Sequence, residues 1–223
     1  MPQPSTSPVR DAFLDAWAVL MPVDCAGCGA PDRALCSACR GELDPAPEWH
    51  RLPDGTPVVS ALDYSGVARQ VILAFKEKGR TDVARWLAAP LTAALEQAAA
   101  GWASLELAPI PTSRASYRRR GYDPVALLVR RSGFRGSSIL KHRRTTLEQK
   151  ALGVESRNRN LAGSLRARHP LQGRRFILVD DVMTTGATLA EAARAIREAG
   201  GEAVAAATVA HTARLFPAHS SSS

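Results

Sequence analysis

The stretch that decides the fold is residues 176–188, Phe-Ile-Leu-Val-Asp-Asp-Val-Met-Thr-Thr-Gly-Ala-Thr. Residues 176–181 are typical of a buried strand that ends in two adjacent carboxylates, Asp180 and Asp181. A Thr/Gly loop then opens a helix predicted over 188–200 and ended by Gly200, and another apolar strand is predicted over 203–209. This strand, helix and strand form one crossover unit. The sequence therefore predicts an α/β fold with a parallel sheet.

The loop over 184–188 has the features of a phosphate site. The start of a helix exposes unpaired backbone N–H groups and the positive end of the helix dipole. Gly186 allows the backbone to approach a ligand closely. Further donors are the hydroxyl groups of Thr184, Thr185 and Thr188. Neither GxxxxGK[ST] nor GxGxxG is present. Two acids ahead of such a loop fit a ribose 5-phosphate, with the phosphate in the loop and the ribose hydroxyls on the carboxylates.

The rest of the chain divides into elements by its apolar pattern. Further strands are predicted over 58–64, 105–111 and 137–140, and further helices over 9–20, 66–75, 82–99 and 124–131. Thr81 can cap the helix over 82–99, and Pro90 predicts a kink in it. Proline-rich residues 42–55 predict a linker, and polar residues 141–175 a long loop. We expect an N-terminal part over 1–53, a main domain over 54–213 and a disordered tail over 214–223.

The four cysteines of the chain form two CxxC pairs separated by seven residues: Cys25, Cys28, Cys36 and Cys39. Two such turns can present four thiolates to one tetrahedral zinc ion, and Gly27 and Gly29 suit tight turns. Two disulfides or an iron–sulfur cluster are the alternatives, and a reducing cytoplasm disfavours the disulfides. We predict a structural zinc, because four cysteines leave no open position for catalysis. The metal would supply the fold of this small zinc knuckle.

Positive charge is concentrated in one part of the chain. The net charge is +8, but residues 114–175 hold 17 basic and three acidic side chains, a local net charge of +14. This asymmetry indicates an anionic partner, either nucleic acid or a phosphorylated small molecule, with a solvated arginine-rich surface as the alternative. No apolar run is long enough for a membrane span, and no secretory signal opens the chain, so we expect a cytoplasmic protein.

The stretch 176–188 resembles the motif that binds 5-phosphoribosyl 1-pyrophosphate (PRPP) in type I phosphoribosyltransferases: apolar residues, two acids, two more apolar residues and T-T-G-x-T. The resemblance implies a parallel-sheet type I phosphoribosyltransferase core. It implies that Asp180 and Asp181 hold the ribose 2′- and 3′-hydroxyls. The 5′-phosphate would be held by Thr184, Thr185, Gly186, Ala187 and Thr188. Mg²⁺ would chelate pyrophosphate and ribose oxygens.

With its N-terminal cysteine knuckle, the chain is similar over residues 10–212 to the ComF family, which is linked to DNA uptake in competent bacteria. Supporting segments are Pro109-Ile110-Pro111-Thr112, Arg120-Gly121-Tyr122, Lys76 ahead of Gly79, and the series Thr145, Gln149, Leu152, Arg157 and Asn160. The chain departs from the family pattern at Asp123-Pro124, where Asn-Gln is usual, and at Glu77-Lys78, where Tyr is usual.

The resemblance also assigns residues around the leaving group. The pyrophosphate loop would comprise Thr112, Ser113 and Arg114. Residues 141–159 resemble a mobile lid that excludes water, with Arg143, Arg144 and Arg157 as phosphate contacts and Arg143 as a catalytic residue. The run Arg118 to Arg120 suits either pyrophosphate or nucleic acid.

Two functions stay open on the sequence. One is a phosphoribosyltransferase that passes phosphoribosyl from PRPP to an unidentified acceptor through an oxocarbenium-like transition state. The other is a non-catalytic competence factor that binds single-stranded DNA, works with DNA-uptake proteins and retains the PRPP pocket. The basic segment favours DNA, but only Tyr117, Tyr122 and Phe134 are available there for base stacking. No general base is evident, and the sequence predicts no oligomeric state.

Overall fold

The computed structural model describes residues 23–31, 33–143 and 163–212. Its strands are β1 (Glu48–Arg51), β2 (Pro57–Asp63), β3 (Glu106–Pro109), β4 (Leu140–His142), β5 (Leu165–Ala167), β6 (Arg175–Met183) and β7 (Glu202–His211). Its helices are α2 (Ser37–Gly41), α3 (Gly66–Glu77), the 3₁₀ turn η1 (Thr81–Val83), α4 (Ala84–Ala99), α5 (Arg114–Arg120), α6 (Pro124–Arg131) and α7 (Ala187–Glu198). Among these described helices, none has the length and apolar character needed to cross a membrane.

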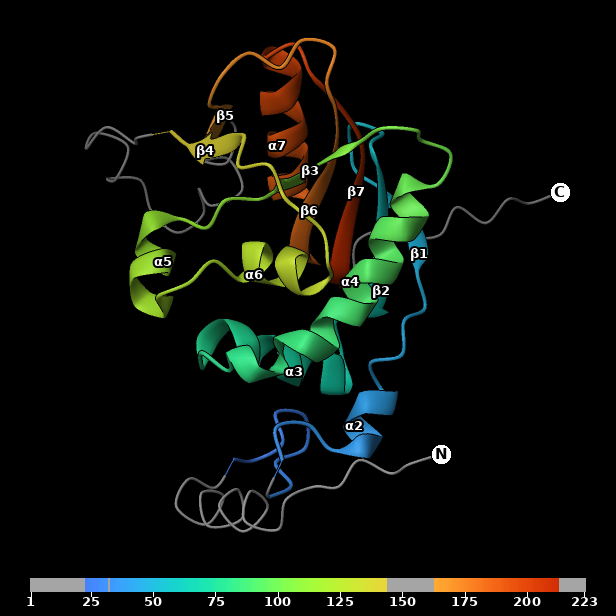
Figure 1. The fold of residues 1–223 in the computed structure, drawn as a ribbon, viewed down its shortest axis with the longest axis vertical. Coiled ribbons are helices and arrows are strands. Elements are labelled where there is room, and N and C mark those ends of the chain that lie inside the picture. Colours follow the sequence, from blue (N-terminus) through green and yellow to red (C-terminus); the bar gives the residue numbers. More distant parts are fainter. Residues whose placement is uncertain (1–22, 32, 144–162, 213–223) are drawn as a thin grey trace, which may run out of the picture.

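Five strands form the main sheet in the order β1-β2-β7-β6-β3 (Figure 1). The strands β2, β7, β6 and β3 run parallel, and β1 is antiparallel to β2. The sheet is therefore mixed but mostly parallel, which confirms the predicted α/β fold. A separate antiparallel pair, β4-β5, lies beside α7.

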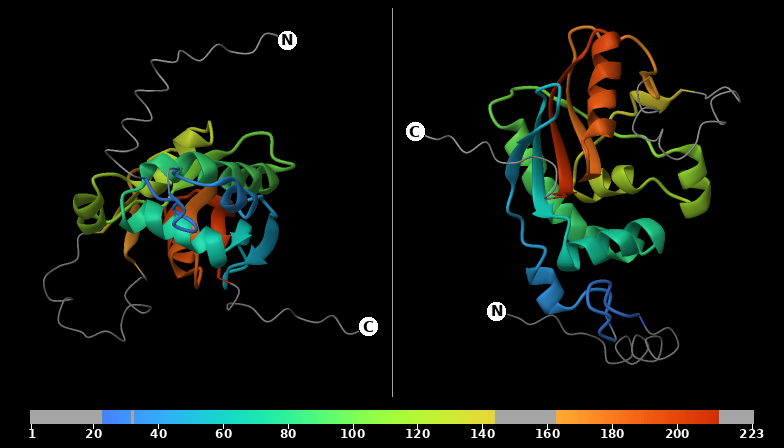
Figure 2. Two further views of the ribbon diagram at one scale, coloured as in Figure 1. Left: turned by 90° about the horizontal axis from the view of Figure 1, so that it is seen from below. Right: turned by 180° about the vertical axis from the view of Figure 1, so that it is seen from behind.

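Helices cover both faces of the sheet, as the view from behind in Figure 2 shows. On β6, Ile177 and Val179 face the core with α3, α4 and α6, whereas Phe176 and Leu178 face the core with α7. Both faces of this strand are therefore buried, which explains why its sequence is continuously apolar instead of alternating. Burial on both faces fixes the position of the acidic residues that follow Val179.

Several predicted elements need correction. Part of the predicted linker is a strand, since residues 48–51 pair with β2, and part of the predicted loop over 141–175 pairs as β4 and β5. The strand predicted over 137–140 begins only at Leu140, and α5 was not predicted. Thr81 opens η1 and makes no side-chain cap, while α4 runs on through Pro90. The helix predicted over 9–20 lies outside the described residues.

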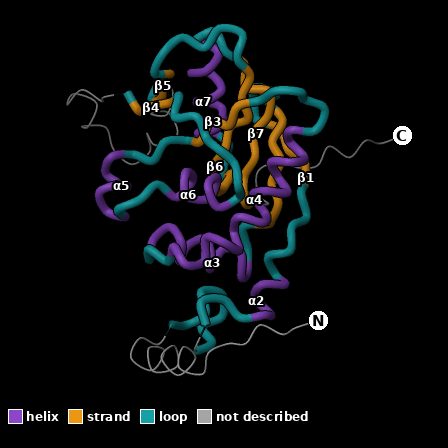
Figure 3. The backbone as a smooth tube through the Cα atoms, in the orientation of Figure 1, coloured by secondary structure: helices purple, strands orange, loops and turns teal. Residues whose placement is uncertain are grey.

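The cysteine segment packs against the end of the main core that carries α3 (Figure 3). Leu35, Cys39 and Leu43 belong to the same apolar cluster as the buried faces of α3 and α4. Arg80, just after α3, donates from Nη1 to the Asp24 carbonyl at 2.9 Å and from Nη2 to the Ala34 carbonyl at 3.4 Å. Apolar packing and one arginine therefore join the N-terminal segment to the domain that follows.

Candidate functional site

The two acids lie near the carboxyl end of β6, two residues further inside the strand than the sequence predicts, because β6 continues to Met183. Asp181 is buried and Asp180 is half-buried. The Asp181 amide donates to Asp180 Oδ1 at 2.9 Å. Lys76, in the last turn of α3, donates from Nζ to Asp181 Oδ1 at 2.9 Å. Figure 1 shows α3 below the ends of β6 and β7, the position from which it supplies this lysine.

Burial and charge give the two acids different properties. Burial and the neighbouring Asp181 carboxylate raise the pKa of Asp180 to about 8, although the Lys76 ammonium acts in the opposite direction. Burial lowers the pKa of Lys76, but the charges of Asp181 and Asp180 outweigh it and raise that pKa. Lys76 and Asp181 therefore form the ion pair, and Asp180 is the acid that holds a proton near neutral pH.

The predicted phosphate loop connects β6 to α7. Thr184 and Thr185 are exposed, and Ala187 and Thr188, at the start of the helix, are half-buried. Gly186 has a φ of +69°, and a Cβ placed there would lie 2.6 Å from Leu52 Cδ2, in the β1-β2 connection. The positive φ therefore favours glycine at this position, and a side chain there would displace the end of the Leu52 side chain and hinder a close approach to a ligand.

The predicted pyrophosphate loop leaves the same edge of the sheet. Pro109 pairs with Val179, and the Ile110 amide donates to the Val179 carbonyl at 2.8 Å, so residues 112–114 begin beside the acids. Asp123, where the chain departs from the family pattern, caps α6 through the Ala126 amide and accepts from the Thr112 amide at 3.3 Å. The substitution by aspartate therefore anchors this loop.

The neighbouring residues of that loop begin α5. Ser113 is the N-cap of the helix and accepts from the Ser116 amide at 3.2 Å, and Arg114 is exposed. Of the three consecutive arginines, Arg119 and Arg120 pair with Glu77 at the end of α3, at 3.0 and 2.6 Å. These pairs hold α5 beside the turn of α3 that carries the lysine. Arg118 is exposed, so it stays available to an anion.

The structure describes only the start of the predicted lid. His142 Nε2 lies 2.8 Å from the Pro111 carbonyl oxygen, so the β4-β5 pair sits against the pyrophosphate loop. The Arg143 amide donates to the Ser164 carbonyl at 2.8 Å, and its side chain is exposed. Among the described residues, no ion pair joins Arg143 to the acids. Residues 144–159, with Arg144 and Arg157, lie outside the described residues, so the lid stays a prediction.

The four cysteines come together as one cluster whose sulfur atoms all lie within 4.8 Å of one another. The Cys36 amide donates to Cys25 Sγ at 3.3 Å, and the Cys39 amide to Cys36 Sγ at 3.4 Å. Burial raises the pKa of the Cys25 thiol, but amide hydrogen bonds outweigh it and lower that pKa to about 6. A Cβ at Gly27 would lie 2.7 Å from Cys39 Sγ, so only glycine fits this turn. The cluster could hold a metal such as zinc.

The residue that sequence reasoning missed is the partner of the buried acid. Lys76 matches a family segment, but no role is predicted for it from the sequence. One signal was available: a carboxylate that follows a doubly buried strand needs a cation or several hydrogen-bond donors. The contact between the end of α3 and Asp181 joins residues 105 positions apart, and no local sequence pattern predicts it.

Comparisons with known proteins agree with this geometry. The family model described as phosphoribosyl transferase domain matches residues 83–218. The DNA utilization protein YhgH of Escherichia coli (strain K12) is 30% identical over 189 residues, covering 81% of this chain and 80% of that protein. The Competence protein F of Haemophilus influenzae is 28% identical over 191 residues, with 81% of each chain covered. The adenine phosphoribosyltransferase of Mycobacterium avium matches over only 39 residues, at 54% identity, covering 18% of this chain and 22% of that protein.

A mostly parallel sheet, a pair of acids followed by a Thr/Gly loop, and the match over 83–218 define the class: the chain belongs to the phosphoribosyltransferase family. With the cysteine cluster and the two relatives that align over about four fifths of its length, it is a ComF-family protein of that class.

Proposed function

We propose that this chain binds PRPP together with Mg²⁺ at the carboxyl edge of the sheet and that the site serves phosphoribosyl transfer. The observation that carries the proposal is that Asp180, Asp181 and the loop over 184–188 follow one another along β6, next to the loop over 112–114. Ligands of open α/β sheets bind at this edge. The two acids would accept hydrogen bonds from the ribose hydroxyls, and the amides at the start of α7 would bind the 5′-phosphate.

The neighbouring cations suit the rest of the ligand. Lys76 neutralises one of the two carboxylates, which reduces the repulsion that two adjacent acids would exert on an anionic ligand. Arg114 and Arg118 are exposed beside the 112–114 loop and can balance the pyrophosphate charge. Mg²⁺ prefers oxygen ligands and keeps several waters, so pyrophosphate and ribose oxygens would hold it, with Asp180 and Asp181 nearby.

In the proposed transfer, the bond between ribose C1 and pyrophosphate breaks, and the leaving pyrophosphate keeps the electron pair. A nucleophilic nitrogen or oxygen of the acceptor bonds to C1 and loses its proton. Positive charge develops on the ribose ring as the bond breaks, and the adjacent carboxylates favour it. The described residues support this part of the site without assigning an acceptor.

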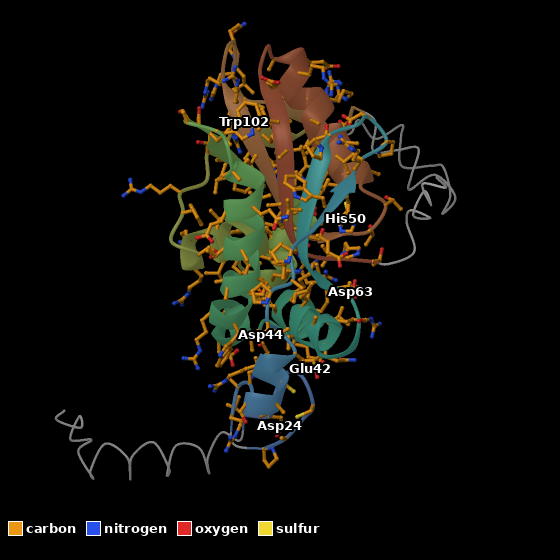
Figure 4. All side chains as sticks on the ribbon, turned by 90° about the vertical axis from the view of Figure 1, so that its right-hand side faces the viewer. Asp24, Glu42, Asp44, His50, Asp63 and Trp102 are labelled. Carbon is orange, nitrogen blue, oxygen red and sulfur yellow. The ribbon has the colours of Figure 1, made fainter. Side chains whose placement is uncertain are left out.

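Calorimetric titration of PRPP in the presence of Mg²⁺ tests the binding site. We expect Asp180→Asn and Asp181→Asn each to weaken binding at least about tenfold, which corresponds to 1.4 kcal/mol. Asp44→Asn is the matched control, because Asp44, labelled in Figure 4, is exposed and precedes β1, which β2 and β7 separate from β6 in the sheet. Thermal unfolding of each variant separates loss of the site from loss of the fold. Equal affinity in the wild type and both site variants would show that PRPP does not bind here.

Turnover is tested separately by measuring pyrophosphate release from PRPP with a panel of nucleobases and amines. Acceptor-dependent release that disappears in Asp181→Asn supports the transferase. Binding of PRPP without release with any acceptor of the panel supports a binding protein that retains the pocket.

One surface favours the second candidate function, binding of single-stranded DNA. The two relatives carry the names DNA utilization protein YhgH and Competence protein F. On α5, Tyr117 is 51% exposed, with the exposed Arg114, Arg118 and Arg119 on the same short helix. An exposed aromatic ring among arginines suits base stacking combined with phosphate contacts. Fluorescence anisotropy with labelled single-stranded DNA should show weaker binding for Tyr117→Ala than for Trp49→Ala, an exposed aromatic control on β1. Equal binding by both variants would exclude α5 as the contact.

The cysteine cluster completes the proposal. We propose that Cys25, Cys28, Cys36 and Cys39 bind one structural zinc ion, because four thiolates with inward-pointing amides close the coordination shell. In this position the ion stabilises the segment that Arg80 attaches to the end of α3.

A further inference from the structure

A pair of histidines lies outside both sites described above. His50, on β1, and His211, the last residue of β7, have ring centroids 4.0 Å apart at an interplanar angle of 43°. In the sequence they are far apart, and neither is part of any motif. The strand β1, where the sequence predicts a linker, brings them together through the sheet.

Each ring has a nitrogen with no partner. Among the described residues, His50 Nε2 and His211 Nδ1 are buried and make no hydrogen bond, and His211 is only 9% exposed. Buried polar atoms are normally satisfied, because an unpaired one loses its bonds to water without replacement. Unsatisfied imidazole nitrogens on two adjacent rings therefore indicate a ligand that accepts lone pairs from both, and a metal cation is such a ligand.

The other nitrogen of His211 has the partner expected in a metal site. His211 Nε2 faces Asp63 Oδ1 at 3.5 Å. Metal-binding histidines commonly direct one ring nitrogen to a carboxylate, which fixes the ring and leaves the other nitrogen to the metal. Figure 4 labels His50 and Asp63 along the β1-β2 edge of the sheet.

Glu48, two residues before His50 on β1, supplies a third donor. One ligand atom from each of Glu48, His50 and His211 lies within 4.8 Å of the other two. Metal bonds of about 2.0–2.2 Å would require these atoms to close by about 1 Å, which side-chain rotation can supply. Three protein ligands of this kind leave a fourth position open.

An acidic cavity leads to this cluster. It has a volume of about 260 Å³, and its lining includes Glu42, Glu48, Asp63 and His211 but no lysine or arginine. A hollow lined by carboxylates concentrates cations, although the chain as a whole is basic.

From these observations we propose that Glu48, His50 and His211 form a second metal site, separate from the cysteine cluster, that binds a divalent transition metal of the zinc class. Imidazole ligands favour zinc, cobalt or nickel over Mg²⁺, which prefers oxygen. The site differs from the cysteine cluster in its donors, which are nitrogen and oxygen instead of sulfur.

Cobalt titration of the tag-free, full-length protein that carries a single equivalent of zinc, bound by the four thiolates, tests the proposal. Thiolate-bound Co²⁺ has a sulfur-to-metal charge-transfer absorption that nitrogen and oxygen ligands lack. We expect one equivalent of Co²⁺ to bind without this absorption. His50→Gln and His211→Gln should abolish that binding, and Glu48→Gln should weaken it at least tenfold.

His169→Gln is the matched control, since His169 is an exposed histidine that follows β5, outside the five-stranded sheet that carries the cluster. Glu48 is exposed, so its variant stays informative even if a histidine variant unfolds, which thermal unfolding would reveal. The proposal is overturned if the wild type binds no Co²⁺ beyond the thiolate-bound ion. It is also overturned if the Glu48 variant and the folded histidine variants bind like the wild type, or if His169→Gln loses the same equivalent.

Discussion

The ion pair between Lys76 and Asp181 should stabilise the fold, and a double-mutant cycle measures by how much. The cycle compares Lys76→Met, Asp181→Asn and the double variant with the wild type. The pair is suited to this test because its charged atoms lie 2.9 Å apart and the side chains are only 26% and 8% exposed.

The expected magnitude follows from these distances and exposures. At 2.9 Å and an effective dielectric constant of about 20, the attraction is about 6 kcal/mol before desolvation is counted. Burial of the lysine and the carboxylate offsets much of this, so we expect a net coupling energy of about 1.5–3 kcal/mol. The solvent-exposed pair Arg175–Glu202 is the matched control and should give less than about 1 kcal/mol.

The two single variants should differ because Asp180 lies next to the pair. In Asp181→Asn, removal of the Asp181 charge lets Asp180 ionise and face Lys76, so part of the stabilisation returns. In Lys76→Met, two adjacent acids are left without the cation. The pKa of Asp180 is already raised to about 8 on the folded chain, whereas on the unfolded chain this carboxyl ionises at about pH 4. Its contribution to stability is therefore lost as pH rises from about 4 through 8, and loss of the cation strengthens this effect. Lys76→Met should therefore be more destabilised at pH 8 than at pH 6.

Urea unfolding followed by circular dichroism at both pH values supplies the free energies. A coupling energy below about 0.5 kcal/mol, no larger than that of the exposed pair, would refute the reasoning. So would a loss of stability in Lys76→Met that is the same at the two pH values.

Three further predictions concern the zinc, the loop and the pH dependence of binding. Cys28→Ser should contain one zinc ion per chain fewer than the wild type in elemental analysis, and its Cys25–Cys39 segment should become sensitive to protease while the sheet stays folded. A wild type without metal would contradict this. Gly186→Val should lower the thermal midpoint as well as PRPP affinity, because its side chain meets Leu52 at a positive φ, and an unchanged midpoint would contradict the packing. PRPP affinity should rise from pH 6.5 to about pH 8 and then level off, because the ribose hydroxyls need ionised Asp180 as their acceptor. Calorimetry in buffers of different ionisation enthalpy should detect the proton that Asp180 releases when PRPP binds. If no proton is released, the role of Asp180 is contradicted.

The sequence predicted the centre of the fold well, because there the determining signals are local. The apolar run of β6, the acids, the Thr/Gly loop and the apolar stripe of α7 are contiguous, and the structure has them within one or two residues of the predicted bounds. The clustering of the four cysteines was also predictable, because only seven residues separate the two CxxC turns and so keep them close together in space.

The elements that were missed depend on partners distant in the sequence. Residues 48–51 contain no apolar alternation and become a strand because β2 supplies their hydrogen bonds. The β4-β5 pair joins segments on either side of residues 144–162. The salt bridge of Lys76 and the histidine pair likewise depend on contacts across 105 and 161 residues, and no local pattern encodes such a distance.

The contacts of Arg80 bear on the design of chimeras in which the cysteine segment is exchanged between relatives. Its guanidinium binds two main-chain carbonyls of the cysteine segment, at Asp24 and Ala34, so the recognition depends on the backbone shape of the knuckle and not on its side chains. A knuckle with the same turn geometry and with apolar side chains at the positions of Leu35 and Leu43 should therefore be transplantable onto this domain, provided that the recipient keeps the arginine. In a chimera that carries Arg80→Ala, apolar packing alone would hold the transplanted cysteine segment against the domain.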